Sequence, residues 1–467
     1  MKIFISIIFL VSSILLSNQH YTKCGFLESL EHTGRNNPPS YNQTIESDNF
    51  IIHYTTSETT QSFAQKASDI AENVRDDYID LGYNEPVYES DGKYYIFINE
   101  RDCGSYGVNR PYNDGTSRTF IEIDNDFLND NCVPGSDPLY FTTGTQAQKI
   151  TLAHEYFHAI QRTYKEITLN VNSYSGYFYE LSATWAEEIL YPNINDYIYW
   201  VNPFFDNLDI EIDDTDGYSI AFYGHYLSSE IGNNSIMREI WEKFENSNSN
   251  IILSTLDEIL NDDYSIDFTT TWVDFCSRNF FNNEYSNMNN NFYFHEDQVY
   301  AEPIFIPSNN IIDLNNSKSI SGSLTNKQIN LYSYTSDSNL AITINNINSN
   351  FYVKYVITSD SKDNYRVKEI NNGDYIYLTA NDELHILIGT FSSDAYDINI
   401  DIESFDFGDI NKNGIINLAD IILLINHIYN GDILDSEYLA LADSNGDNIY
   451  DITDITYLVS VINDLDS

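Results

Sequence analysis

Hydrophobic and polar positions change their spacing along the chain, and each change indicates a different kind of structure. Short runs that alternate apolar and polar residues come first, and this period of two predicts strands. These runs are NFIIHYTT, KYYIFIN and SRTFIEID, at residues 49–56, 93–99 and 117–124. A polar helix is predicted near residues 61–81, and from Gly144 to Lys165 the period is again helical, with further helices to about Asn282. Strands followed by helices are typical of an α+β domain, here residues 47–290.

Alternating runs return after a polar boundary at residues 283–305. Seven such runs follow with turn residues between them, which predicts a β-sandwich over residues 305–404. The runs are SISGSL, QINLYSY, LAITINN, FYVKYVIT, YIYLTA, ELHILIGT and YDINIDIE. Residues 407–467 differ again, because an acidic loop followed by an apolar helix occurs there twice. The pattern therefore predicts a multidomain chain.

The N-terminus, MKIFISIIFLVSSILLSNQH, has one lysine before an apolar and small run from Ile3 to Leu16. This run is short for a bilayer span and polar residues follow it at once, which favours a secretory signal peptide over residues 1–17. A retained membrane anchor is the alternative. No other segment is long and apolar enough to cross a membrane, so we expect a secreted, extracellular protein, associated with a scaffold or a cell surface. Residues 18–46 are predicted to form an irregular leader, and the sequence leaves open whether a propeptide is removed.

Charge narrows the possible partners. The chain has 22 Lys and Arg against 71 Asp and Glu, which gives a formal net charge of −49. Such a field repels phosphate backbones, so we expect no nucleic-acid partner, and it attracts divalent cations. Apolar residues make up 42% of the chain, with 38 Tyr and 26 Phe, so the chain can bury real cores.

All four cysteines lie beyond the predicted signal peptide: Cys24, Cys103, Cys132 and Cys276. An even number in an exported chain suggests two disulfides, with three possible pairings. We favour Cys103 with Cys132 as one bridge. Buried free thiols in an anaerobic setting are the alternative.

The C-terminal repeat has the spacing of calcium loops. DINKNGIINLAD and DSNGDNIYDITD carry oxygen ligands at positions 1, 3, 5, 9 and 12 and a backbone carbonyl at position 7. The predicted ligands are Asp409, Asn411, Asn413, Ile415, Asn417 and Asp420, then Asp443, Asn445, Asp447, Ile449, Asp451 and Asp454. Gly414 stands at the sharp turn of the first loop, and Asn448 replaces it in the second. The repeat therefore predicts two Ca²⁺ ions.

Two such loop–helix units, 34 residues apart and without the entering helix of an EF-hand, closely resemble a type I dockerin. The resemblance implies a small all-α domain that folds with calcium. It also implies docking onto a cohesin domain of a scaffolding protein, as in cellulosomes. The partner-recognition positions of the family fall on Leu418, Ala419, Ile452 and Thr453. These two pairs differ, which leaves symmetric dual-mode binding and the type of cohesin open.

A candidate metal site lies in TLAHEYFHAIQ. His154 and His158 are four residues apart, so a helix places both imidazoles on one face, and Glu155 lies at its edge. A hydrolytic zinc needs a third protein ligand and an open position for water. The chain has no third histidine at the metzincin spacing. In FYELSATWAEEILYP, Glu180 comes 22 residues after His158 and shares a helix face with Glu187, whereas Glu188 is expected to be solvated.

AHEYFHAIQ followed by YELSATWAEE is similar to the secreted zinc metalloproteases of the gluzincin, or peptidase-MA-like, class. The resemblance implies a zincin-like catalytic domain, Glu180 as third ligand of one catalytic Zn²⁺, and Glu187 as the trailing glutamate. Leu181 replaces the usual glycine of that motif. Thr184 stands where related enzymes carry an aspartate that orients a histidine, so that orientation would rest on a hydroxyl or a backbone carbonyl.

Zinc would activate a water molecule, and Glu155 would take its proton before attack on a peptide carbonyl. The developing oxyanion needs a donor. The segment DGYSIAFYGHYL offers Tyr218, Tyr223 and His225. Tyr218 is favoured because the family pattern has a tyrosine before a small residue there. The SRTFIEID strand is expected to be the substrate-binding edge.

The sequence thus predicts a secreted zinc endopeptidase that is anchored to a cohesin-bearing scaffold. A non-catalytic adhesion or assembly component is an alternative, although the presence of Glu155 argues against it. A zinc hydrolase acting on glycopeptides is a third possibility. The sequence fixes neither the substrate nor the role of the β-sandwich.

Overall fold

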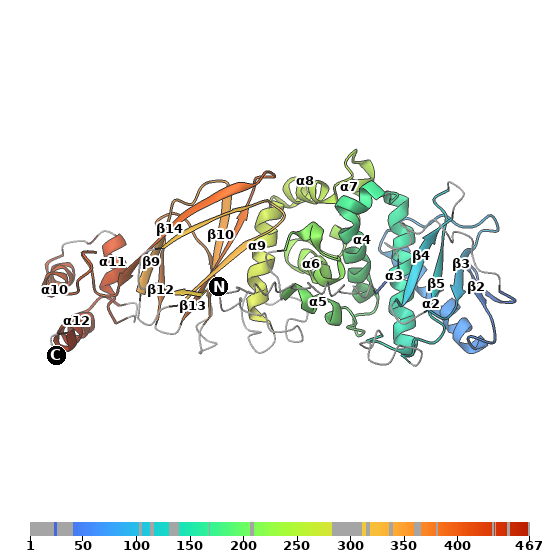
Figure 1. The fold of residues 1–467 in the computed structure, drawn as a ribbon, viewed down its shortest axis with the longest axis horizontal. Coiled ribbons are helices and arrows are strands. Elements are labelled where there is room, and N and C mark those ends of the chain that lie inside the picture. Colours follow the sequence, from blue (N-terminus) through green and yellow to red (C-terminus); the bar gives the residue numbers. More distant parts are fainter. Residues whose placement is uncertain are drawn as a thin grey trace, which may run out of the picture. The chain divides into compact units, whose positions relative to one another are not determined.

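A computed structural model describes most of the chain (Figure 1). The described residues are 23–25, 41–101, 105–112, 116–129, 140–167, 169–205, 210–282, 311–313, 318–335, 340–358, 366–379, 382–431, 434, 436–445 and 449–465. The chain divides into two compact units, Met1–Glu72 with Tyr88–Glu155, and Asn73–Val87 with Tyr156–Ser467. The division falls inside one continuous helix, α3, between Glu155 and Tyr156.

The first unit contains a five-stranded sheet in the order β1-β2-β3-β5-β4. Its strands are β1 (Gln43–Glu46), β2 (Phe50–Tyr54), β3 (Tyr94–Ile98), β4 (Gly107–Pro111) and β5 (Thr119–Ile123). Strands β2, β3 and β5 run parallel, and β1 and β4 are antiparallel to their neighbours. The three alternating runs are therefore strands, as expected, but the sheet already begins at Gln43, inside the expected leader.

The sheet order corrects one expectation. SRTFIEID forms β5, which lies between β3 and β4 and is buried at every position, so it is not an edge. The edge strand on that side of the sheet is β4, whose short sequence GVNRP carries no clear alternation and was not predicted. The residues of β5 alternate in sequence, but every position of the strand is buried, so the alternation did not mark a solvated face.

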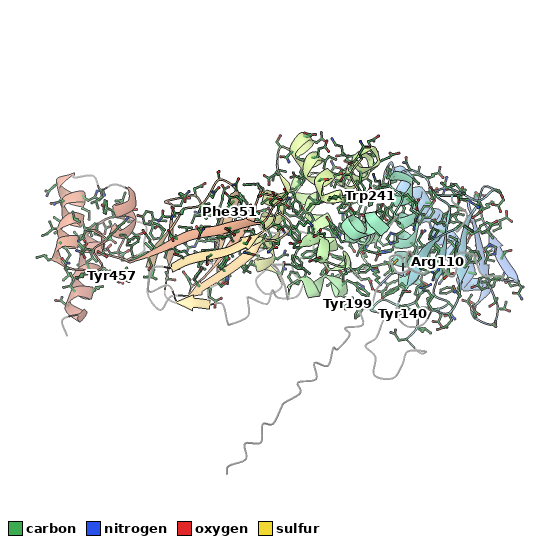
Figure 2. All side chains as sticks on the ribbon, turned by 45° about the horizontal axis from the view of Figure 1, so that its top comes forward. Arg110, Tyr140, Tyr199, Trp241, Phe351 and Tyr457 are labelled. Atoms are coloured by element: carbon green, nitrogen blue, oxygen red, sulfur yellow. The ribbon has the colours of Figure 1, made fainter. Side chains whose placement is uncertain are left out.

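Helices dominate the rest of the α+β region. They are α2 (Gln61–Asp80), α3 (Gly144–Tyr164), α4 (Leu169–Leu190), α5 (Ile198–Phe205), η1 (Ile212–Asp214), η2 (Tyr218–Ile220), α6 (Ala221–Tyr226), η3 (Leu227–Ile231), α7 (Ser235–Asn246), α8 (Ile252–Tyr264), α9 (Phe268–Arg278) and η4 (Asn279–Phe281). Helix α4 is central, because every residue from Ser175 to Glu188 is buried. Trp241 of α7, labelled in Figure 2, packs its ring 4.8 Å from that of Tyr179 on α4.

A β-sandwich follows, as the alternating runs predicted. Its strands are β6 (Ile311–Asp313), β7 (Lys318–Leu324), β8 (Asn330–Thr335), β9 (Leu340–Asn345), β10 (Phe351–Thr358), β11 (Arg366–Glu369), β12 (Tyr375–Leu378), β13 (Glu383–Thr390) and β14 (Tyr396–Asp406). They form two sheets, β11-β10-β13-β8-β6 and β12-β9-β14-β7, which share a core of buried Ile, Leu, Val, Tyr and Phe side chains. The short strands β6 and β11 were not predicted.

Helix α9 packs on the sandwich. The Thr269 hydroxyl donates to the Thr390 carbonyl at 2.9 Å, and Lys354 of β10 forms an ion pair with Asp274. Burial alone would raise the pKa of Asp274, but the nearby Lys354 and Arg278 outweigh it and hold that pKa below its usual value. This ion-paired contact joins the helices to the first sheet of the sandwich.

The C-terminal region is all-helical. It contains α10 (Leu418–Ile425), η7 (Asn426–Asn430), α11 (Ser436–Ala442) and α12 (Ile452–Leu465). The helices share a small core that includes Ile421, Leu424 and Leu458. No helix among the described residues is both long and apolar enough to cross a membrane.

Candidate metal site

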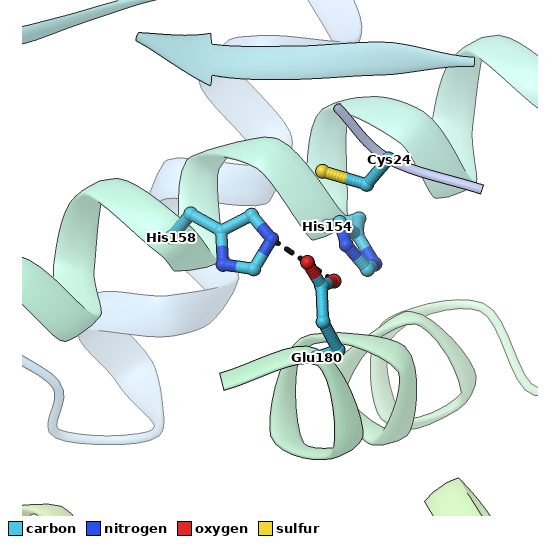
Figure 3. A group of neighbouring side chains, drawn as sticks. All are labelled: Cys24, His154, His158 and Glu180. Carbon is cyan, nitrogen blue, oxygen red and sulfur yellow. Dashed lines mark ion pairs between the residues drawn. The ribbon is translucent and has the colours of Figure 1, made fainter. Parts of the chain in front are cut away.

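The two histidines of AHEYFHAIQ lie one turn apart on α3, and both are buried, at 1% exposure for His154 and 0% for His158. Small and apolar residues of α3, Ala153 and Phe157 among them, are fully buried beside them. A histidine pair on such a helix reaches one point in space, because residues four apart share a face. Figure 3 shows both rings directed toward the same place.

Glu180 of α4 faces these rings (Figure 3). Its Oε2 lies 3.4 Å from His158 Nε2, and both side chains are fully buried. The neighbouring turn explains why the backbone can approach so closely. Gly217 has φ +85°, and a Cβ atom there would lie 2.1 Å from the Tyr177 carbonyl oxygen and 2.8 Å from Glu180 Cβ. Only glycine fits that turn, which lies directly against the Cβ atom of Glu180.

A fourth donor joins the group. One ligand atom each from Cys24, His154, His158 and Glu180 lies within 4.8 Å of all the others, and all four residues are buried. Two imidazole nitrogens, a carboxylate oxygen and a sulfur are donor types that zinc prefers. The residues therefore fit a zinc ion. Sequence reasoning missed Cys24, because a cysteine far from the motif has no spacing signal; its place in a polar leader was the only clue.

A glutamine orients His158. The ring nitrogen Nδ1 lies 2.8 Å from Gln161 Oε1, and Gln161 Nε2 donates to the Tyr179 carbonyl at 2.8 Å and to the Ser182 hydroxyl at 3.0 Å. When Nδ1 carries the proton, Nε2 presents its lone pair toward Glu180, as a metal ligand requires. Gln161 is the last residue of the quoted motif AHEYFHAIQ, and its role was not predicted.

Thr184 does not have the role that was expected of it. It is fully buried on α4, and its hydroxyl has no hydrogen-bond partner among the described residues. The hydroxyl therefore orients neither histidine. Gln161 supplies that function for His158 instead.

The other two glutamates of α4 are both buried at 2% exposure. Glu187 was expected to support the site. It is not among the four clustered donors. Its charge instead acts on Tyr78: burial is the main cause that raises the pKa of Tyr78, and the charge of Glu187 raises that pKa further.

Glu188 was expected to be solvated, and this was wrong. It lines a cavity of about 360 Å³ with His225 and Ser228. Helix α4 is enclosed on all sides there, so even its third glutamate is removed from solvent.

Glu155 lies beside the edge strand. It is 1% exposed, and its backbone carbonyl accepts a hydrogen bond from Asn109 Nδ2 of β4 at 3.1 Å. A Cβ atom on Gly107 of β4 would lie 3.0 Å from Glu155 Cγ and 2.7 Å from Thr151 Cγ2. Glycine thus allows the edge strand to lie directly against the face of α3 that carries Glu155.

The three candidate oxyanion donors have different surroundings in the structure. Tyr218 follows Gly217, so its backbone lies next to Glu180, and its ring packs 5.6 Å from that of Trp200. The Tyr223 hydroxyl instead pairs with Thr271 Oγ1 at 2.8 Å inside a cluster of aromatic rings. His225 lies in the cavity beside Glu188. Of the three, the Gly217 turn places only Tyr218 next to a predicted zinc ligand.

The cysteine expectation is tested only in part. Cys103 and Cys132 lie outside the described residues. Cys276 is a buried free thiol in α9, and burial raises its pKa well above the usual value. A second disulfide through Cys276 is therefore not formed.

The first calcium loop has the expected turn. Gly414 has φ +80°, and both oxygens of Asp409 accept backbone N–H bonds, from Asn413 at 3.1 Å and Gly414 at 2.7 Å. At position 12, Asp420 is fully buried and accepts from the backbone of Asn411 and Asn417. The side chains thus turn their oxygens inward around the loop.

The second loop repeats this arrangement at its end. Asp454 is fully buried and accepts backbone bonds from Asn445 at 3.2 Å and Asp451 at 2.9 Å. Asp447 lies outside the described residues. The four predicted recognition positions are all exposed: Leu418, Ala419, Ile452 and Thr453. Two of them are large and apolar, with Leu418 at 65% and Ile452 at 57% exposure, and such apolar side chains in solvent suit a docking surface.

Comparison with known proteins identifies the C-terminal region. Residues 407–463 match the model of the dockerin type I domain, so this part of the chain is a type I dockerin domain. No curated protein matches the chain in sequence.

Three solved structures show distant likeness. The g-type lysozyme inhibitor PliG of Salmonella Typhimurium has 10% identity and a TM-score of 0.17, and the match covers 21% of this chain and 100% of that one. The Yersinia pseudotuberculosis-derived mitogen has 14% identity and a TM-score of 0.15, over 20% and 87%. The catalytic module of the metalloprotease ZmpA from Clostridium perfringens has 13% identity and a TM-score of 0.28, over 76% and 67%. At such scores the likeness carries no argument about activity.

Proposed function

We propose that this chain is a secreted zinc endopeptidase with a gluzincin-type site in a zincin-like domain, which its dockerin anchors to a cohesin-bearing scaffold. The observation that carries the proposal is that donor atoms of His154, His158 and Glu180 lie within 4.8 Å of one another, while Glu155 is the next residue after His154 on α3. A buried site with this donor set and an adjacent carboxylate suits metal-assisted hydrolysis.

Each residue of the proposed zinc site has a separate role in hydrolysis. His154, His158 and Glu180 would hold Zn²⁺, which when bound lowers the pKa of water toward ~7 and polarises a carbonyl. Glu155 would take the proton of the attacking water and pass it to the leaving amine. Gln161 holds the His158 ring in the orientation that binding needs. The Tyr218 hydroxyl is the candidate donor to the developing oxyanion.

The edge strand β4 would hold the substrate. A peptide in extended form can add to an exposed sheet edge through main-chain hydrogen bonds, and β4 lies against Glu155. This arrangement supports a protein or peptide substrate rather than a small molecule.

The dockerin sets the location. Its loops would bind two Ca²⁺ ions, and helices α10 and α12 would present Leu418, Ala419, Ile452 and Thr453 to a cohesin. The chain would then act outside the cell, at a scaffold or a cell surface.

A second function is favoured by one observation, the sulfur of Cys24 among the donors. Four protein ligands close a zinc site, and closed sites are structural. The chain would then be a non-catalytic, scaffold-borne adhesion component.

A cleavage experiment separates the two functions. Zinc-loaded full chain and its Glu155→Gln variant are incubated with a mixed proteome, and new peptide ends are counted by mass spectrometry. The same pair is compared in a Cys24→Ser background. Loss of the proton acceptor should reduce cleavage about 10²–10⁴-fold. If neither chain produces ends that its Glu155→Gln partner lacks, the peptidase proposal is wrong.

A further inference from the structure

Residues Lys23, Cys24 and Gly25 lie on the edge of the first sheet as a short extended segment with a single isolated β-bridge. Cys24 makes a parallel bridge with Gly107 of β4. The Tyr106 N–H donates to the Lys23 carbonyl at 2.9 Å, and the Gly25 N–H donates to the Gly107 carbonyl at 3.1 Å. Two main-chain bonds therefore hold the backbone on either side of Cys24.

This segment occupies the Gly107 end of the edge that a peptide substrate would use. β4 is the last strand of the sheet, and its Gly107 lies against Glu155 and Thr151 of α3. Since Cys24 pairs with the same Gly107, the leader lies at the register of the proposed general base. An edge already paired with the protein's own chain cannot add a second strand.

Side chains hold the segment as well. Lys23 and Cys24 are each 2% exposed, and the Lys23 ammonium lies 5.7 Å from the centre of the Tyr106 ring. At Gly25 the backbone lies against Val108 and against Arg101, whose guanidinium bonds to the Ser105 hydroxyl at 2.6 Å. A buried, multiply bonded segment is a built part of the fold.

The Cys24 sulfur lies in the metal cluster, within 4.8 Å of the donor atoms of both histidines and Glu180 (Figure 3). Zinc in hydrolytic sites keeps one position open, whereas a fourth protein ligand closes it. A thiolate is a strong zinc ligand, so Cys24 would exclude the water that Glu155 needs.

We propose that Cys24 is the fourth ligand of this metal site and that residues 23–25 hold the chain in a latent state. The inference rests on the proposed peptidase function. Both requirements of hydrolysis are blocked together, the water position by the sulfur and the substrate edge by the backbone. Activation would release the Cys24 sulfur from the metal and free β4; the departing thiolate would take a proton from solvent, a water molecule would take the vacated position, and nothing would be oxidised or reduced.

The test measures the metal–sulfur bond directly in the full chain. Zinc is replaced by cobalt, whose bond to a thiolate gives an intense near-ultraviolet charge-transfer band. Wild type should show this band, Cys24→Ser should lose it, and Cys276→Ser should retain it, because that thiol is buried in α9. A zinc–sulfur distance of about 2.3 Å in X-ray absorption spectra should follow the same pattern. Absence of the band from wild type, or its persistence in Cys24→Ser, overturns the proposal.

An activity measurement then distinguishes the latent state from its alternatives. Cys24→Ser should cleave protein at least about tenfold faster than wild type, equivalent to about 1.4 kcal/mol, and the gain should require Glu155. Equal Glu155-dependent cleavage by both chains overturns the latent state and leaves the peptidase proposal intact. A cobalt–sulfur band with no Glu155-dependent cleavage in either chain identifies a closed structural site and overturns both proposals.

Discussion

The candidate metal cluster and the dockerin loops bring their predicted cation ligands together in opposite ways. The cluster collects donors from residues 24, 154, 158 and 180, all buried. Each dockerin loop collects its ligands from twelve consecutive residues, of which the aspartates at position 12 are the most deeply buried. The first site depends on packing between distant segments, whereas the second depends on a local turn.

The two sites therefore differ in the structural support that their ligands need. A buried carboxylate and two imidazoles lose hydration, so the cluster needs a rigid surround: α4 is enclosed, and Gly217 and Gly107 permit backbone approach that a Cβ would prevent. The loops keep water nearby and need only Gly414 and backbone N–H bonds to turn the carboxylates inward. Removal of calcium should therefore unfold the dockerin, whereas removal of zinc should leave the residues of the buried cluster in place.

The largest expected effect is removal of calcium. Asp420→Ala or Asp454→Ala deletes the buried ligand at position 12 of one loop, and the binding energy of the ion is folding energy for so small a domain. Cohesin affinity should fall at least about 100-fold, equivalent to about 2.7 kcal/mol. The measurement is calorimetric titration with a type I cohesin.

Chelation of calcium from the wild type should have the same effect, while zinc content stays unchanged after a calcium-selective chelator. Asp420→Ala and Asp454→Ala also compare the two loops. If the two variants lose unequal amounts of cohesin affinity, one loop dominates docking. Unaltered cohesin binding without calcium would contradict the proposed role of the loops.

A smaller effect is expected from the residue that orients His158. Gln161→Met keeps the length of the side chain but removes the acceptor for Nδ1 and the donor to Tyr179. Loss of such a partner weakens zinc binding about 10–100-fold. Zinc affinity is measured by competition with a chromogenic chelator.

Thr184→Val is the matched control on α4, because the Thr184 hydroxyl bonds to no described residue. It should change zinc affinity less than about twofold, which is below 0.5 kcal/mol. If Thr184→Val weakened zinc binding more than Gln161→Met, the assignment of the orienting residue would be reversed.

A different kind of effect, spread over several pH units, is expected from a buried histidine outside the metal cluster, which has one carboxylate nearby, Glu383 Oε2 at 3.7 Å from Nε2. His385 of β13 is 1% exposed, with Ser333 Oγ 2.6 Å from Nδ1 and Thr358 Oγ1 3.0 Å from Nε2. Burial lowers its pKa to about 3. Because the unfolded chain binds the proton near pH 6.5 and the folded one does not, stability is lost as pH falls from about 6.5 toward 3.

The slope over that interval should include about 1.4 kcal/mol per pH unit from this one side chain. His385→Gln should remove this contribution from the pH dependence of unfolding by urea. An identical pH dependence in both chains would show that folding does not change the pKa of the His385 ring. The result bears on the comparison, because it separates burial of a histidine from its use as a ligand.

Much of the fold was predictable where periodicity is strong. The sandwich strands, α2, α3 and the dockerin loops follow their patterns closely. β4 and β11 were missed because short strands with few apolar side chains, GVNRP and RVKE, set no clear period in the sequence. The helix α4 was recognised, but its enclosure on all sides was not, which is why Glu188 was wrongly expected to be solvated.

The sequence by itself determined the local chemistry. HExxH places two imidazoles on one helix face, and a twelve-residue loop carries its own calcium ligands, because both depend on spacing within one element. Only the tertiary structure showed how residues far apart in the chain meet them: Glu180, expected from the resemblance, lies 3.4 Å from His158, Gly107 and β4 lie beside Glu155, and Cys24 lies at the site. These contacts arise from packing between segments far apart in the chain, and spacing along a sequence carries no record of such distances.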